Sequence, residues 1–292
     1  MKTNDIFTFR RFGKYFASDL RTCAANYGLT LATITILVQI GLYVTCVGFT
    51  LMFGKVWQAP GIGLRVAAFV VAMLCLTITM PVKCYGRLTE KQYGSFWISI
   101  PASRLEKFLS MLILTCIIVP LTGTAIYLTF DWLICLIDKT CGDNIIGTFI
   151  NIGGEVNKAI NELTAEEIMI NGTMISTDFM ESITSPWIYI DEYIVMCLPF
   201  LLGAIFFKSA KVVKTFLAIA AISSITGMIM TPIMAEYYID MFNGAISEEQ
   251  AMIEMFNSGL FKHLPLIDTI TDTIYNVGLL AGIWFRIKTL KH

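Results

Sequence analysis

Four carboxylates near the ends of long apolar runs are the residues best suited to ion chemistry: Asp131, Asp191, Asp268 and Asp272. Asp268 and Asp272 are four residues apart, so they share one face of a helix. Ionisable side chains in membrane segments tend to be functional when they are deeply buried. The four residues therefore predict a cation-attracting outer mouth or exit site. The alternative interpretation is that each carboxylate lies near the headgroup level, where its helix end meets solvent.

A second pattern, Ser103-x-x-Glu106, has the spacing of a capping box. In such a box the serine hydroxyl and the glutamate carboxylate each accept a hydrogen bond from the other residue's backbone N–H. The spacing predicts a helix that begins at Arg104, just after Pro101, and runs directly into the next apolar run. A basic loop fixed in this way to a membrane helix can transmit force from a cytoplasmic partner. It can equally be an ordinary loop with a capped helix start.

The chain contains no sequence motif for the other common kinds of catalytic or binding chemistry. The glycine–lysine pairs at 13–14 and 54–55 lack the GxxxxGK[ST] spacing that binds phosphates, and no HExxH or GxSxG motif is present. The two histidines, His263 and His292, are too few for a histidine-based metal site, and the eight cysteines form no CxxC pair. We therefore expect no catalytic residue, cofactor or metal in this chain, which is not predicted to be an enzyme, and no nucleic-acid partner.

The elements that must position these residues are membrane helices. The 292 residues are 56% hydrophobic and only 15% charged, with a mean hydropathy of +0.69, whereas soluble domains have about a quarter charged residues. About 20 apolar residues in a helix cross a bilayer. Six runs qualify, which predicts an all-α, polytopic integral membrane protein and a single transmembrane domain over 1–292: 29–53, 62–82, 109–130, 188–207, 215–235 and 264–285.

The basic residues decide the expected orientation. Sixteen of the 21 Lys and Arg residues fall in the N-terminal segment, the loop after the second run, the turn between the fourth and fifth runs, and the tail. Cytoplasmic loops carry the excess of basic residues. All four segments lie on one side only if the number of spans is even. The pattern therefore predicts six spans with both termini in the cytoplasm.

Three connecting segments have patterns of their own. In the N-terminal segment, 1–28, the side chains Phe9, Phe12, Phe16 and Leu20 recur at helical spacing, which predicts a cytoplasmic helix lying in the membrane interface. The alternative is a solvated helix packed against the cytoplasmic loops. The acidic insert 138–187 lies outside, with a helix predicted over 154–170, and a shorter helix is predicted within 236–262.

The loop from 83 to 108 also carries a resemblance. Its phrase IPASRLEKF, from Ile100 to Phe108, resembles the LPAS-x-x-EKF phrase that follows the second span in membrane permease subunits of bacterial ATP-binding-cassette transporters. The likeness is to the type-2 exporter family, especially Bacteroidetes-like sequences. The basic amphipathic start, six spans and short basic tail also resemble that family, whereas the long acidic insert departs from its simplest members.

The resemblance implies a function and partners. Such permeases pair to form a pore or cleft, so it implies a homodimer or a pair with a related permease in the bacterial cytoplasmic (inner) membrane. A separate ATPase subunit docks on a coupling helix between spans two and three, which here corresponds to about 84–95 within the coupling loop 83–108. Arg87, Glu90 and Lys91 would then be the docking charges.

Two other functions stay open on the residues alone. One is a membrane anchor, sensor or assembly protein that presents the insert 138–187 outside and has no transport role. The other is an ion-coupled secondary transporter that uses the carboxylates as proton or ion sites. The first predicts a ligand on the insert and no ATPase. The second predicts carboxylates at midplane depth.

Overall fold

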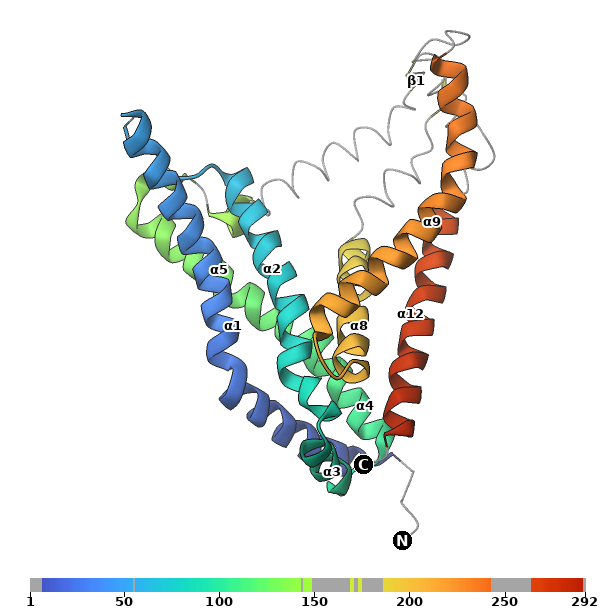
Figure 1. Ribbon diagram of the computed structural model, residues 1–292. Coiled ribbons are helices and arrows are strands. Elements are labelled where there is room, and N and C mark those ends of the chain that lie inside the picture. Colours follow the sequence, from blue (N-terminus) through green and yellow to red (C-terminus); the bar gives the residue numbers. More distant parts are fainter. Residues whose placement is uncertain are drawn as a thin grey trace.

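The computed structural model describes residues 7–54, 56–142, 144–148, 169–170, 173–174, 186–242 and 264–290. Helices dominate the described chain, as predicted (Figure 1). The long helices are α1 (Phe9–Phe53), α2 (Ile62–Tyr85), α8 (Pro186–Phe206), α9 (Lys211–Phe242) and α12 (Leu264–Thr289). Between α2 and α8 lie η1 (Gly86–Thr89), α3 (Lys91–Ser99), α4 (Arg104–Leu112), η2 (Ile113–Ile118), α5 (Val119–Ile137) and η3 (Lys139–Cys141).

Three continuous helical stretches are long and apolar enough to cross a membrane: Phe9–Phe53, Ile62–Thr89 and Arg104–Ile137. This supports the prediction of a membrane protein. In α8 the described side chains form a shorter apolar stretch, Met196–Phe206. Helices coincide with all six predicted runs, but the number of spans and their orientation stay predictions.

The start of α1 continues directly into the first predicted span. The sequence predicts an interfacial helix over 1–28 and a span over 29–53, and α1 covers residues of both in one uninterrupted helix of 45 residues. At 1.5 Å per residue it is about 67 Å long, roughly twice the thickness of a bilayer core. The helix bends, and its first part lies across the lower end of the molecule before the rest turns upward beside α2 (Figure 1).

The helix α4–η2–α5 contains a wide π-turn with a local cause. Pro120 is at the start of α5 and has no N–H to donate to the preceding turn, and its ring crowds the carbonyl four residues back. The π-turn at Ile113–Ile118 accommodates this. The carbonyl of Thr115, inside the π-turn, accepts a hydrogen bond from Cys197 Sγ of α8 at 3.7 Å, so the irregular turn also contacts the second half of the chain.

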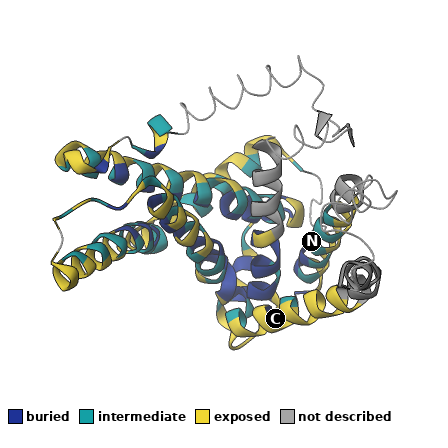
Figure 2. Ribbon diagram, turned by 90° about the horizontal axis from the view of Figure 1, so that it is seen from above, coloured by how far each residue is buried: buried dark blue, intermediate teal, exposed yellow. Residues whose placement is uncertain are grey.

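The tightest packing lies toward the lower end, where α2, α4, α8 and α12 meet. Leu76, Leu88, Met111, Leu201 and Ile283 belong to one buried apolar cluster there. Figure 2 shows buried residues gathered where the helices meet and exposed ones along the outward sides. Those outward sides carry many large apolar side chains, such as Leu37 and Val44 of α1, as expected of helices whose outer surface faces lipid.

The four basic segments lie at one end of the molecule. The first part of α1, the η1–α3 loop, the α8–α9 turn and the end of α12 all lie toward the lower end of Figure 1. Lys211 Nζ at the start of α9 donates to Thr89 Oγ1 of η1 at 2.7 Å. Arg286 Nε of α12 donates to the Ile205 carbonyl of α8 at 3.1 Å. The basic segments that connect the helices therefore lie together at one end of the molecule.

Most of the acidic insert lies outside the described residues, including 154–168 of the helix predicted over 154–170. The last two residues of that range are not helical: β1 (Met169–Ile170) pairs antiparallel with β2 (Thr173–Met174). The shorter helix predicted within 236–262 is described only to Phe242, where α9 ends.

Candidate functional site

The capping box begins the site at the lower end. Glu106 N–H donates to Ser103 Oγ at 3.2 Å, and Ser103 N–H donates to Glu106 Oε2 at 2.8 Å. Both bonds of the box are therefore present, and α4 begins at Arg104 as the sequence predicts. The Glu106 side chain is fully buried.

Glu106 also binds the start of α1. Arg11 Nε donates to Glu106 Oε2 at 2.7 Å, and the backbone N–H of Thr8 donates to Glu106 Oε1 at 3.0 Å. One carboxylate thus caps two helices, α1 and α4. Burial opposes ionisation of Glu106, but the hydrogen bonds from Arg11, Thr8 and Ser103 outweigh it and lower its pKa to about 2.

The next residue, Lys107, binds the end of α3 instead of α1. Its Nζ donates to the carbonyl oxygens of Trp97 at 2.7 Å and Ile98 at 3.2 Å, and lies 4.8 Å from the Trp97 ring centroid. These carbonyls end α3, so Lys107 supplies the cationic C-terminal cap of that helix. Burial and the nearby Arg104 lower the pKa of Lys107 to about 8.

We call this arrangement the joint; it comprises Thr8, Arg11, Ser103, Glu106 and Lys107 with the Trp97 and Ile98 carbonyls. A neighbouring contact strengthens it. Asp19 Oδ2 of α1 accepts hydrogen bonds from Tyr85 OH of α2 at 2.9 Å and Ser110 Oγ of α4 at 2.7 Å. The first part of α1, the end of α3 and the start of α4 are therefore held together by buried, charge-assisted bonds.

The docking charges implied by the resemblance lie on the outer side of this joint. Arg87 Nε and Glu90 Oε2 are 3.6 Å apart, and both side chains are 60% exposed. Lys91, at the start of α3, is also exposed. The three residues are close together in η1 and α3 and stay accessible from solvent, although Arg87 and Glu90 form an ion pair with each other.

Helix α3 has two different faces. Gly94 and Trp97 are buried against the molecule, whereas Phe96 is 66% exposed. Lys91, at the start of the same helix, is exposed as well. A short helix that is anchored by one face and exposes an aromatic ring on the other has the features of a contact surface for another protein.

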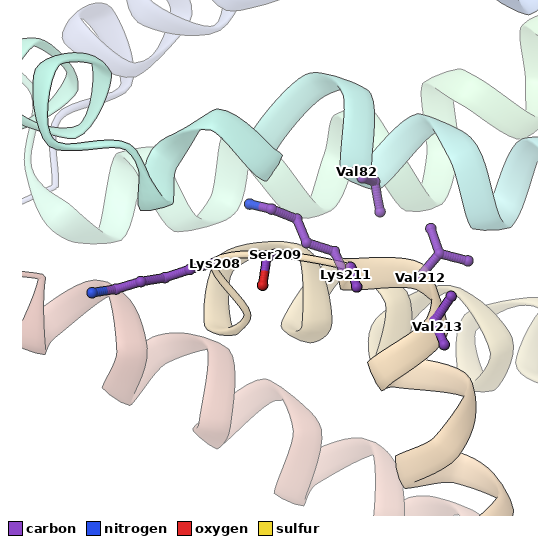
Figure 3. A pocket seen from close by; sticks show the side chains of 7 residues that line it. Val82, Lys208, Ser209, Lys211, Val212 and Val213 are labelled. Atoms are coloured by element: carbon purple, nitrogen blue, oxygen red, sulfur yellow. The ribbon is translucent and has the colours of Figure 1, made fainter.

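A shallow hollow lies beside the α8–α9 turn (Figure 3). Its volume is about 330 Å³, and its lining includes Val82 of α2 and Val212 of α9. Lys211 reaches from the turn toward α2, where Nζ bonds the Gly86 carbonyl, while Lys208 points away from the hollow. Ala210, the residue before α9, has a left-handed backbone with φ of 49°. The turn is therefore strained where it positions Lys211 against η1.

The predicted outer carboxylates are not brought together as one group by the described side chains. Asp191 is in α8 and Asp268 in α12, and both side chains lie outside the described residues. Asp272 is half-buried in α12. Asp131 is only 1% exposed and accepts from Arg65 Nη1 at 3.2 Å, so it is paired inside the protein and does not face solvent.

Arg65 and Asp131 form the centre of a buried group that also includes Cys135, Cys141 and Ile145, here called the Arg65 cluster. Arg65 Nη1 lies 2.9 Å from Cys135 Sγ, and Arg65 Nη2 donates to the Cys141 carbonyl at 3.0 Å. Ile145 N–H donates to Asp131 Oδ2 at 3.0 Å. The cluster therefore fixes α2 to α5 and holds the beginning of the insert against both.

Sequence reasoning missed three of these charges. Arg11 and Lys107 looked like ordinary basic residues of cytoplasmic segments, and Arg65 looked like a charge flanking a span. Two signals were present. Lys107 follows the capping glutamate within the IPASRLEKF phrase. Arg65 and Asp131 carry opposite charges at the outer ends of two successive runs, where antiparallel helices bring them to one level.

Comparison with protein-family models, curated proteins and solved structures found no match.

Proposed function

We propose that this protein is the transmembrane permease subunit of an ATP-binding-cassette transporter, with six spans and both termini in the cytoplasm. A separate ATPase subunit would supply the energy. The observation that carries the proposal is the construction of α3: one face is buried, the other exposes Lys91 and Phe96, and Lys107 caps its end. These features suit a helix that receives a partner and passes its movement on.

The path for that movement runs through the joint. A displacement of α3 pulls on Lys107 and hence on α4, which is continuous with η2 and α5 through Ile137. Glu106 passes the same displacement to the start of α1 through Arg11. Lys211 connects η1 to α9 in the second half of the chain. Charged side chains therefore connect the η1–α3 loop directly to α4–η2–α5 and to α9, and through Glu106 to the start of α1.

The orientation is supported by the common position of the basic segments. Because these segments lie at one end of the molecule, the positive-inside tendency assigns that end to the cytoplasm. In this proposal the protein lies in the bacterial cytoplasmic membrane and pairs with itself or a related permease. The substrate binds between the paired subunits.

The structure gives the ion-coupled alternative little support, because Asp131 is held by Arg65 instead of facing a pathway. The non-transport alternative rests on the acidic insert, most of which lies outside the described residues. The permease is therefore the function that the described geometry favours.

The test is co-purification of an ATPase with the tagged, full-length protein in mild detergent. The wild type is compared with Arg87→Glu/Lys91→Glu and with Phe96→Ala, which removes the exposed ring without changing charge. The matched control is Phe216→Ala, an exposed ring on α9 away from the η1–α3 loop. We expect an ATPase to be recovered with wild type and control and lost with both loop variants. Failure to recover an ATPase even after crosslinking would overturn the proposal.

A further inference from the structure

The fold brings six of the chain's eight cysteines together in three pairs whose thiol groups interact. The pairs are Cys23 with Cys84, Cys116 with Cys197, and Cys135 with Cys141. All six residues are free thiols in the structure. Neither the proposed function nor the joint uses any of these pairs. We call Cys23 and Cys84 the inner pair, and Cys135 and Cys141 the outer pair.

The inner and outer pairs lie at opposite ends of α2. Cys84 is in the last turn of this helix, at the end where the basic segments gather (Figure 1), and the outer pair surrounds Arg65 in its first turn. Cys84 follows Arg65 by 19 residues, which is about 28 Å along a helix and close to the thickness of a bilayer core. In the proposed orientation the inner pair is therefore on the cytoplasmic side and the outer pair on the extracytoplasmic side.

The outer pair is held in place by its surroundings. Arg65 Nη1 lies 2.9 Å from Cys135 Sγ, and Arg65 Nη2 donates to the Cys141 carbonyl at 3.0 Å, so one guanidinium contacts both residues. After α5 ends, the short turn η3 brings the chain back, with Cys141 N–H donating to the Asp138 carbonyl at 3.1 Å. Tyr43 OH lies 3.4 Å from Cys141 Sγ. The turn and Arg65 thus keep the two thiols next to each other.

Reagents from the extracytoplasmic space can reach the outer pair. Cys135 is half-buried near the end of α5, and the residues Lys139 and Thr140 that follow it are exposed. Disulfides form and persist in extracytoplasmic spaces, whereas thiols that face the cytoplasm are kept reduced. The two pairs therefore meet different redox conditions, although both consist of neighbouring thiols.

We propose that Cys135 and Cys141 form a disulfide on the extracytoplasmic side, whereas the inner pair stays reduced. The inference goes beyond the proposed function and rests on its orientation. The two thiols are oxidised to one disulfide. The oxidant is a disulfide of the extracytoplasmic space, carried by a thiol–disulfide oxidoreductase or a small molecule, and it is reduced to two thiols that take up both electrons and both protons.

The bond would fix a corner at the outer end of the molecule. It closes a loop over residues 135–141, and two residues of this loop hold the connection between α1 and α2. Asp138 Oδ2 accepts from Trp57 Nε1 at 2.8 Å, and Thr140 Oγ1 accepts from Ala59 N–H at 3.1 Å. Because the acidic insert begins at 138, the same bond gives the insert a fixed base.

The experiment is differential alkylation of the full-length protein in the membranes of the bacteria that express it. Free thiols are blocked with N-ethylmaleimide in denaturant, disulfides are then reduced, and the released thiols are labelled with iodoacetamide. Peptide mass spectrometry measures both labels at each cysteine. We expect the iodoacetamide label to exceed the N-ethylmaleimide label at least about tenfold on the outer pair, and the reverse ratio on the inner pair.

Two variants test whether the outer cysteines bond to each other. In Cys135→Ser the thiol of Cys141 should carry N-ethylmaleimide. The matched control, Cys23→Ser/Cys84→Ser, removes the inner pair and should leave the labels of the outer pair unchanged. Dithiothreitol should also lower the thermal unfolding midpoint of the wild type in detergent by about 2–5 °C, and it should not change the midpoint of Cys135→Ser/Cys141→Ser.

N-ethylmaleimide on both outer cysteines of the wild type overturns the proposal, and so does iodoacetamide on Cys141 in the Cys135→Ser variant. If the inner pair carries iodoacetamide and the outer pair does not, the orientation is reversed and the proposed function fails as well. An oxidised outer pair together with a pull-down that recovers no ATPase would instead overturn the proposed function alone.

Discussion

The Arg65 cluster and the joint are both buried charged groups, but they are built differently. In the cluster both charges are almost inaccessible, with Arg65 and Asp131 each 1% exposed. In the joint the carboxylate of Glu106 is fully buried, whereas its partner Arg11 is 30% exposed and several of the other bonds involve backbone groups. The cluster is therefore a fixed attachment, while water can replace Arg11 at the joint and allow the helices to move.

The surroundings of the two groups agree with this difference. The cluster joins α2 to α5 and to the segment that directly follows α5, with 66 positions separating Arg65 from Asp131. The joint connects the start of α1 to residues more than 90 positions later. A buried pair between α2 and α5 stabilises the first half of the fold. A partly exposed group between distant segments suits transmission of movement.

The largest effect is expected from breaking the cluster. Asp131→Leu leaves the Arg65 guanidinium buried without its carboxylate, which should lower the free energy of unfolding by about 3–5 kcal/mol. Arg65→Met/Asp131→Leu removes both charges and should recover most of that loss. Thermal unfolding midpoints in detergent measure both variants. Equal destabilisation by the single and double changes would contradict the view of a paired attachment.

A second expected effect concerns the α8–α9 corner that holds Lys211 beside η1. A Cβ at Gly203 would overlap Thr215 Oγ1, and that hydroxyl already donates to the Lys211 carbonyl at 2.8 Å. Gly203→Ala should therefore cost about 1–3 kcal/mol through overpacking.

Gly41→Ala is the matched control for this change, because no atom lies within 4 Å of a Cβ built there. In the interior of α1 it should be neutral or stabilise the protein by up to about 1 kcal/mol. Unfolding midpoints compare the two substitutions. A tolerated alanine at position 203 would show that α8 and α9 are less closely packed than described.

The joint should respond to acid in a way that the cluster does not. Because the folded-state pKa of Glu106 is lowered from 4.5 to about 2, its contribution to stability is complete above about pH 4.5 and is lost as pH falls toward 2. Proteolytic release of the first part of α1, compared at pH 5 and pH 3 with an acid-stable protease, measures the loss.

Glu106→Gln is the control for this pH dependence. The variant should release the first part of α1 at both pH values. The part of the pH dependence that comes from Glu106 should then disappear. Burial raises the pKa of Asp19, although the hydrogen bonds from Ser110 and Tyr85 act to lower it. The contribution of Asp19 to the pH dependence therefore has the opposite sign from that of Glu106, and it is present in both the wild type and the variant. A pH dependence that is identical in wild type and variant would exclude Glu106 as its source.

The smallest effect is expected at the strained turn. Ala210→Gly relieves the left-handed backbone of an alanine and should stabilise the protein by up to about 1 kcal/mol. The matched change Ala218→Gly, at an exposed position inside α9, should instead destabilise it by about 0.5–1 kcal/mol. Unfolding midpoints of the two variants should therefore shift in opposite directions, and shifts of the same sign would contradict the strained conformation.

The sequence by itself determined the features that depend on neighbouring residues. Its long apolar runs indicate membrane helices, the box at Ser103 and Glu106 marks the start of α4, and the basic residues fall in four segments. Each of these signals is local, because helix hydrogen bonds and caps join residues three or four positions apart.

Only the tertiary structure decided which charges meet. Arg65 finds Asp131 across 66 residues, Arg11 finds Glu106 across 95, and Lys107 turns back to α3 instead of facing solvent. The same packing joined the predicted interfacial helix and first span into one bent helix. A charged side chain near a helix end has the same sequence pattern whether it is solvated or buried. The packing of the neighbouring helices decides between the two, since a buried charge persists only where a partner offsets its lost hydration.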